Sequence, residues 1–175
     1  KLFKSRISYP PLRPFVGGIL IALAVYLLGT TRYIGLGIPT LVSSFNESGM
    51  PYDFILKLLF TTFTIGAGFK GGEVTPLFFV GATLGNALAF VLPLPMALLA
   101  GMGFVAVFSG ATHTPIACTI MGMELFGIES GIFIGIACII AYFSSGSVGI
   151  YQAQIVKGAK HHMYQKLKRK NTDFL

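Results

Sequence analysis

The sequence predicts an all-α, polytopic membrane protein whose helices are tilted and broken. The chain has 175 residues, of which 54% are hydrophobic and only 11% are charged, whereas a soluble domain carries about a quarter charged residues. Its apolar segments mostly hold about 12 to 18 residues, although about 20 are needed to cross the hydrocarbon core. Non-helical backbone at membrane depth is tolerated only where it is buried or lines a polar cavity, as in transporters with broken helices. The pattern therefore favours a transport protein over a simple membrane anchor.

The chain divides into three stretches. Residues 1–14 form a basic lead-in at the cytoplasmic interface, residues 15–150 form the transmembrane helical part, and residues 151–175 form a final amphipathic helix with a basic cytoplasmic tail. Within the transmembrane part we expect apolar helices over 15–29, 54–68, 75–92, 96–110, 114–127 and 130–146, and a polar loop over 30–53.

Each expected boundary has a local cause. Pro10, Pro11 and Pro14 end the lead-in, and Gly and Pro residues punctuate the 30–53 loop. Pro93 and Pro95 stop the third helix, and Gly127 stops the fifth, because proline cannot continue a helix and glycine favours its end.

The cations lie at the two ends of the chain. Only Lys57 and Lys70 occur between Arg32 and Lys157. By the positive-inside rule both ends of a multi-pass protein in the cell membrane lie in the cytoplasm. Beside so much apolar sequence, the basic tail is expected to contact anionic lipid headgroups rather than nucleic acid.

Enzyme, metal and redox chemistry have little support in the sequence. No metalloprotease or nucleophile-elbow motif is present, so we expect a protein that is not an enzyme and that needs no metal or cofactor. Cys118 and Cys138 lie inside apolar segments without ligand or redox spacing and are expected to be buried packing residues.

The stretch GAGFKGGEVTPLFF, residues 66–79, interrupts the apolar pattern. Pro76 suits the first turn of a helix, and Thr75 is expected to be its N-cap. The unpaired N–H groups at such a helix start, together with its positive dipole end, form an anion site. Gly71 and Gly72 would let the backbone approach the anion, and Thr75 would add a hydroxyl donor.

Glu73 is the unexpected residue at this break. An ionised carboxylate repels an anion, and burial raises the pKa of a carboxyl group, so a glutamate that alternates between charge states could carry a proton against the anion. Ionisable residues inside a membrane are functional hypotheses by default. The alternative is an interfacial Glu73 that pairs with Lys70, and the sequence leaves both open.

GGEVTP, preceded by LLFTTFTIGAG, resembles the C-terminal half of the CLC family of anion channels and antiporters. Glu73 followed by Val-Thr-Pro is similar to the branch that exchanges fluoride for protons. The resemblance extends through GMGFVAVFSGATHTPIACTIMGMELFG and GSVGIYQAQI.

The resemblance implies that Gly72, Val74 and Thr75 bind the anion, that Tyr151 donates a hydroxyl and gates it, and that Glu73 couples protons. It also implies the CLC fold, with this chain as one of two inverted halves, the N-terminal half as partner, and a homodimer. The alternatives are a chloride or general anion channel of the same family and a non-transporting membrane scaffold.

Small residues and one histidine complete the expectations. Gly81 with Gly85, and Gly131 with Gly135, fit the small-xxx-small pattern of closely packed membrane helices. The resemblance makes the second pair the candidate for the dimer interface, and the first pair is read as internal packing. His113 is read as a loop histidine near the surface.

Overall fold

The computed structural model describes residues 9–146 and 149–151, so the expected final helix and basic tail lie outside the described residues. It contains helices α2 (Leu12–Leu28), α3 (Ile38–Ser43), α4 (Asp53–Gly66), α5 (Val74–Leu88), α6 (Met96–Thr112), α7 (Pro115–Phe126) and α8 (Gly131–Ser144), and the 3₁₀ turn η1 (Ile128–Ser130). No strand occurs in these ranges, which confirms the all-α class. Within them, no helix is both long and apolar enough to cross a membrane.

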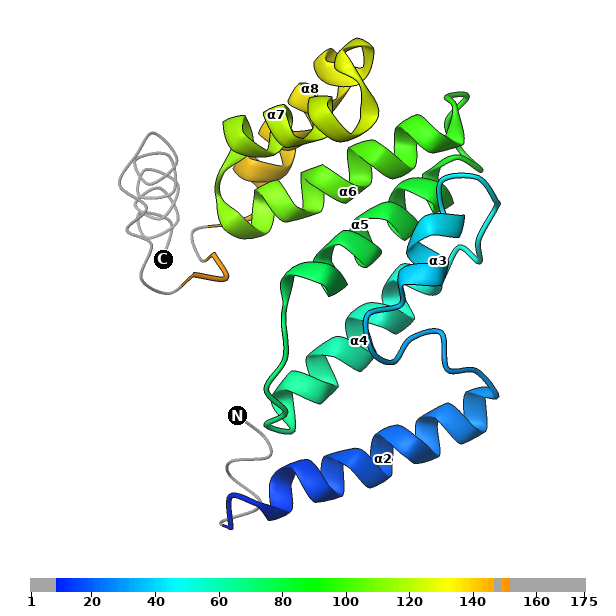
Figure 1. Ribbon diagram of the computed structural model, residues 1–175, viewed down its shortest axis with the longest axis vertical. Helices are drawn as coiled ribbons and strands as arrows, with labels where there is room; N and C mark the ends of the chain where they lie inside the picture. The colour runs from blue at the N-terminus through cyan, green and yellow to red at the C-terminus, as the bar shows by residue number, and fades with distance from the viewer. Residues whose placement is uncertain (1–8, 147–148, 152–175) are drawn as a thin grey trace, which may run out of the picture. The chain divides into compact units, whose positions relative to one another are not determined.

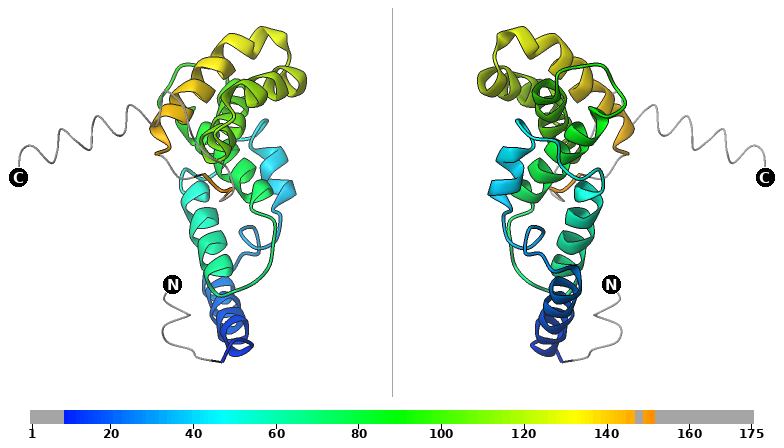
Figure 2. Two further views of the ribbon diagram at one scale, coloured as in Figure 1. Left: turned by 90° about the vertical axis from the view of Figure 1, so that its left-hand side faces the viewer. Right: turned by 90° about the vertical axis from the view of Figure 1, so that its right-hand side faces the viewer.

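The described residues form two compact units, and the division between them falls within α6, after residue 104. In the first unit, α4 lies between α2 and α5 (Figure 1). The short helix α3 packs against α5 (Figure 2). The apolar face of α5 is the centre of this unit, because Phe79 and Ala82 are fully buried.

Close helix packing in the first unit depends on glycines. A Cβ atom on Gly81 or Gly85 would collide with backbone atoms of α6, at Gly103 and Leu99 respectively. The ring of Phe78 on α5 stacks on that of Phe104, with centroids 4.1 Å apart. The reading of Gly81 and Gly85 as internal packing residues is therefore confirmed.

In the second unit, α7 and α8 pack side by side, and the turn η1 connects them (Figure 1). Cys118 and Cys138 are buried free thiols, as expected. The structure corrects the expectation that Gly131 faces a partner subunit. A Cβ atom on Gly131 would lie 2.9 Å from Cγ of Met123 on α7, so the glycine makes room for a neighbour in the same chain. Gly135 is half-buried and lies near Thr119, also on α7.

The helix boundaries differ from the expected ones mainly at prolines. Helix α2 begins at Leu12 and includes Pro14, so it starts inside the expected lead-in. The expected loop over 30–53 contains α3, with Pro39 in its first turn. Proline fits all these positions because the first four N–H groups of a helix need no intrahelical acceptor.

His113 is buried rather than near the surface, with 8% of its area exposed. It occupies the sharp turn between α6 and α7 with a positive φ of 59°. Its ring meets that of Tyr142 edge-on, with centroids 5.9 Å apart. The expectation failed because α8, which is distant in sequence, covers this turn.

Candidate anion-binding site

The site candidate is the break between α4 and α5 in the first unit. Helix α4 ends at Gly66, and Gly68 then adopts a left-handed conformation with φ of 98°, which an L side chain rarely adopts. The amide of Phe69 donates to the carbonyl oxygen of Thr64 at 3.3 Å, which closes this turn. Residues 70–73 lie outside both helices and lead to the start of α5.

Glu73, not Thr75, is the N-cap of α5. The amide of Leu77 donates to the carbonyl oxygen of Glu73 at 3.3 Å, so the intrahelical ladder starts two residues earlier than expected. Pro76 then occupies the third helical position, where its missing N–H leaves no bond unmade. The Glu73 side chain makes no capping hydrogen bond, so its carboxylate is not engaged by the helix that it begins.

The first amides of α5 are open. Within the part of the chain that the structure describes, the N–H groups of Val74 and Thr75 have no hydrogen-bond acceptor, and both residues are half-buried. The hydroxyl group of Thr75 likewise has no partner there. Three donors at the positive end of a 15-residue helix are therefore available to an anion.

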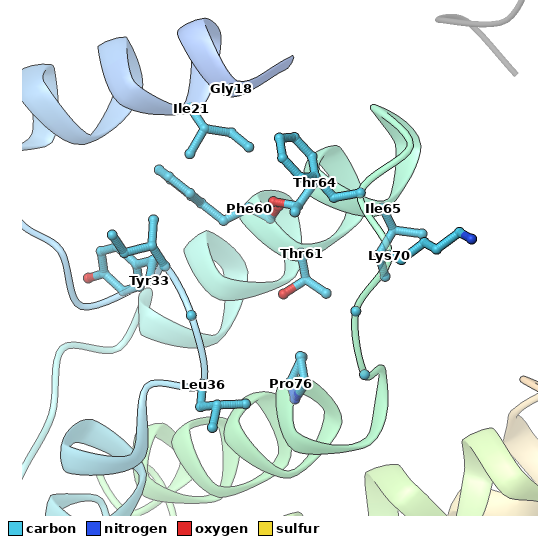
Figure 3. A pocket seen from close by; sticks show the side chains of 15 residues that line it. Gly18, Ile21, Tyr33, Leu36, Phe60, Thr61, Thr64, Ile65, Lys70 and Pro76 are labelled. Carbon is cyan, nitrogen blue, oxygen red and sulfur yellow. The ribbon is translucent and has the colours of Figure 1, made fainter. Parts of the chain in front are cut away.

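Glu73 and Lys70 are both exposed, and no ion pair joins them in the described residues. The Lys70 amine points away from the neighbouring side chains of α4 (Figure 3). The expected alternative of a Lys70–Glu73 pair is thus not formed. The expected burial of Glu73 is not provided by this chain either, because its side chain is open on the surface of the first unit.

A cavity of about 430 Å³ adjoins the break. Its walls come from α2, the loop after it, α4 and the start of α5 (Figure 3). Gly71, Gly72 and Pro76 line it on the side of the break, and most other lining residues are apolar. Of the predicted site residues only Gly72 lines this cavity, whereas Glu73, Val74 and Thr75 lie beyond it.

Tyr151 belongs to the second unit, where 52% of its area is exposed. The backbone just before it is held by a hydrogen bond from the amide of Ile150 to the carbonyl oxygen of Ala111, at 2.9 Å. Of the predicted site residues, the first unit thus holds Gly72, Glu73, Val74 and Thr75 at the start of α5, and the second unit holds Tyr151.

The first unit also contains a buried polar cluster that was not predicted from the sequence. Asp53 and Lys57, one turn apart on α4, are each only 1% exposed. Asp53 Oδ1 accepts a 2.6 Å hydrogen bond from the hydroxyl of Tyr33. Lys57 Nζ donates to the carbonyl oxygens of Gly35 at 2.7 Å and Tyr33 at 3.2 Å. Two ionisable residues at i and i+4 beside an apolar run could have indicated it.

A family model described as voltage gated chloride channel matches residues 1–146. A chloride/fluoride channel protein of Pseudomonas syringae pv. tomato is 56% identical over 165 residues, which cover 91% of this chain and 36% of that protein. A voltage-gated ClC-type chloride channel, ClcB, of Salmonella typhimurium is 32% identical over 146 residues, which cover 75% of this chain and 34% of that protein.

The chain is also similar to a protein of known structure. The crystal structure of a CLC-type fluoride/proton antiporter matches with a TM-score of 0.78 and 42% sequence identity, over 82% of this chain and 37% of that one. The chain thus spans little more than a third of the length of these relatives.

Proposed function

The chain belongs to the CLC family of voltage-gated chloride channels, and from that premise we propose that it forms the C-terminal half of a fluoride/proton antiporter. The observation that carries this proposal is the open start of α5, where the amides of Val74 and Thr75 have no acceptor in the described chain. Fluoride is small and a strong hydrogen-bond acceptor, so amide and hydroxyl donors suit it better than an apolar lining. The names of the relatives, chloride/fluoride channel protein and fluoride/proton antiporter, support the choice of ion.

In this proposal Gly72, Val74 and Thr75 bind the anion, and Tyr151 contributes its hydroxyl. Glu73 carries the proton, because its side chain lies at the same helix start and is not held by a cap or an ion pair. The N-terminal half of the transporter covers the break and buries Glu73. The protein is multi-pass in the cell membrane with both ends of this chain in the cytoplasm.

The test is fluoride efflux from liposomes that hold the complete two-half protein, measured with proton uptake. We expect Glu73→Gln to uncouple the fluoride flux from proton movement. Glu129→Gln, at an exposed glutamate in η1 of the second unit, serves as the matched control and should leave coupling intact. Unchanged proton-coupled efflux in Glu73→Gln would remove this residue from the mechanism.

A chloride channel of the same family is the second candidate, since the relative of Pseudomonas syringae is named for both ions. Measuring fluoride and chloride flux in the same liposomes separates the two, because the antiporter should favour fluoride and move protons. A protein that conducts neither ion would instead be a membrane scaffold.

We also propose a homodimer through α7 and α8. Each helix exposes isoleucines one turn apart, namely Ile116 and Ile120 on α7 and Ile132, Ile136 and Ile140 on α8. Such a face packs well against a second copy of itself, because helix association in a membrane depends on close van der Waals packing.

A further inference from the structure

The buried cluster on α4 contains two opposite charges that do not pair with each other. Asp53 and Lys57 lie one turn apart, yet no described ion pair within 4 Å joins them. Each is held separately by the segment after α2. Tyr33 donates its hydroxyl to Asp53, whereas the carbonyl oxygens of Tyr33 and Gly35 accept from Lys57. The positions of both charges are therefore fixed by hydrogen bonds.

The contacts around Lys57 hold its side chain in place. Two carbonyl oxygens accept from its ammonium group, and Nζ lies 4.9 Å from the centroid of the Phe79 ring. Hydrogen bonds to carbonyls and the face of an aromatic ring both stabilise a cation. Gly37 also packs against the Phe79 ring, since a Cβ atom there would lie 2.7 Å from it. The loop, Lys57 and Phe79 thus form one contiguous contact.

Lys57 and Asp53, both on α4, lie beside different parts of α5. Lys57 contacts Phe79, the sixth residue of this helix. Asp53 lies near its other end, because Asp53 Oδ2 and Asn86 Oδ1 both approach Gly49, within 3.3 and 3.5 Å of where its Cβ would be. Phe79 and Asn86 are seven residues apart, or about 10 Å along the helix axis. The positive charge is therefore nearer to the start of α5.

This orientation matters at the candidate anion site. The level of Phe79 is five residues, or about 7.5 Å along the axis, from Val74. Both charges are buried, so water screens their field much less than at a surface. The electrostatic field of the Lys57–Asp53 pair adds to the field of the α5 dipole, whose positive end lies at the start of that helix.

We propose that Lys57 is a fixed counter-charge for the anion bound at the start of α5, and that Asp53 opposes it from farther away. This inference rests on the proposed anion site. Because Lys57 lies beside Phe79 rather than at the helix start, it acts through space, by raising the affinity for the anion rather than by carrying it.

The test measures the fluoride concentration at half-maximal flux, and the maximal rate, in liposomes with the complete two-half protein. Lys57→Gln removes the charge but keeps an amide that can donate to the loop, and Lys57→Arg keeps the charge. We expect Lys57→Gln to raise the half-saturating concentration about three- to tenfold, and Lys57→Arg to stay near the wild-type value.

Asp53→Asn distinguishes a charge effect from a structural one. Removal of this carboxylate should lower the half-saturating concentration by about twofold, opposite in sign to Lys57→Gln. Tyr33→Phe, which removes a hydrogen bond at the cluster without changing charge, should leave that concentration unchanged. Loss of folded protein would lower the maximal rate in each variant but would not move the half-saturating concentration in opposite directions.

The outcomes separate this inference from the proposed function. Equal half-saturating concentrations in the wild type and Lys57→Gln, or shifts of the same sign in Lys57→Gln and Asp53→Asn, would overturn the role of Lys57 and leave anion transport standing. If the protein moves chloride rather than fluoride, the same comparison is made with chloride. A wild-type protein that transports neither anion would overturn both proposals.

Discussion

Gly81 and Gly103 face each other where α5 crosses α6, and each occupies the space that a side chain of the other would need. A Cβ atom on either glycine would collide with the carbonyl oxygen of the other. Helix α5 begins at the candidate anion site, so this contact fixes the helix whose start would bind the ion.

Gly81→Ala is therefore expected to lower the free energy of unfolding by about 1–3 kcal/mol, because the added methyl group meets rigid backbone. The shift is measured as a lower Tm in detergent micelles. Gly66→Ala is the matched control, since Gly66 is also helical and a Cβ atom there would meet nothing within 4 Å. The control should be neutral or stabilise by up to about 1 kcal/mol, and a similar loss in both variants would contradict the packing argument.

Asn86 anchors the opposite end of α5. Its amide nitrogen donates to the carbonyl oxygens of Ser44 and Glu47, at 2.7 and 2.8 Å, and its Oδ1 accepts from the amide of Gly49 at 2.9 Å. Asn86→Ala would leave three backbone groups without a partner, at a cost of about 2–4 kcal/mol.

Thermal unfolding of Asn86→Ala should be compared with that of Asn46→Ala. Asn46 is exposed, and its replacement should change stability by less than about 0.5 kcal/mol. Equal Tm values for Asn86→Ala and the wild type would show that these three hydrogen bonds do not hold the 44–49 segment.

The hydroxyl of Thr75 is expected to matter for anion affinity. Thr75→Val keeps the shape and removes a donor, so the half-saturating fluoride concentration should rise about tenfold, as for the loss of a hydrogen bond to a charged group. Thr75→Ser should stay close to the wild type. Flux in liposomes is the measurement. Thr62→Val on the exposed face of α4, whose hydroxyl is bonded to the Leu58 carbonyl oxygen, should leave the concentration unchanged.

Truncation of the isoleucine side chains that α8 exposes is expected to weaken a homodimer. Replacing Ile132 and Ile136 together by alanine removes packing area one turn apart, so dimers should dissociate at a higher protein-to-lipid ratio than in the wild type. Cross-linking across a series of such ratios measures this. Leu23 and Leu27, exposed at the same spacing on α2, give the control double variant, and equal effects of the two pairs would argue against an interface on α8.

The sequence by itself determined the helical class, the succession of short apolar segments and the position of the break at residues 66–79. These follow from composition and from glycine and proline, whose effects on the backbone are local. The same local rules misplaced the N-cap at Thr75, because a proline in the first turn permits a helix to start at any of several preceding residues.

Only the tertiary structure decided which polar groups are buried and which glycines face which helix. Asp53, Lys57 and His113 are covered by segments far away in the chain, and Gly131 makes room for Met123 rather than for a partner. Burial depends on contacts between distant segments, whereas a helix start depends on neighbouring residues. For that reason the motif could be read in the sequence, and the buried charges beside it could not.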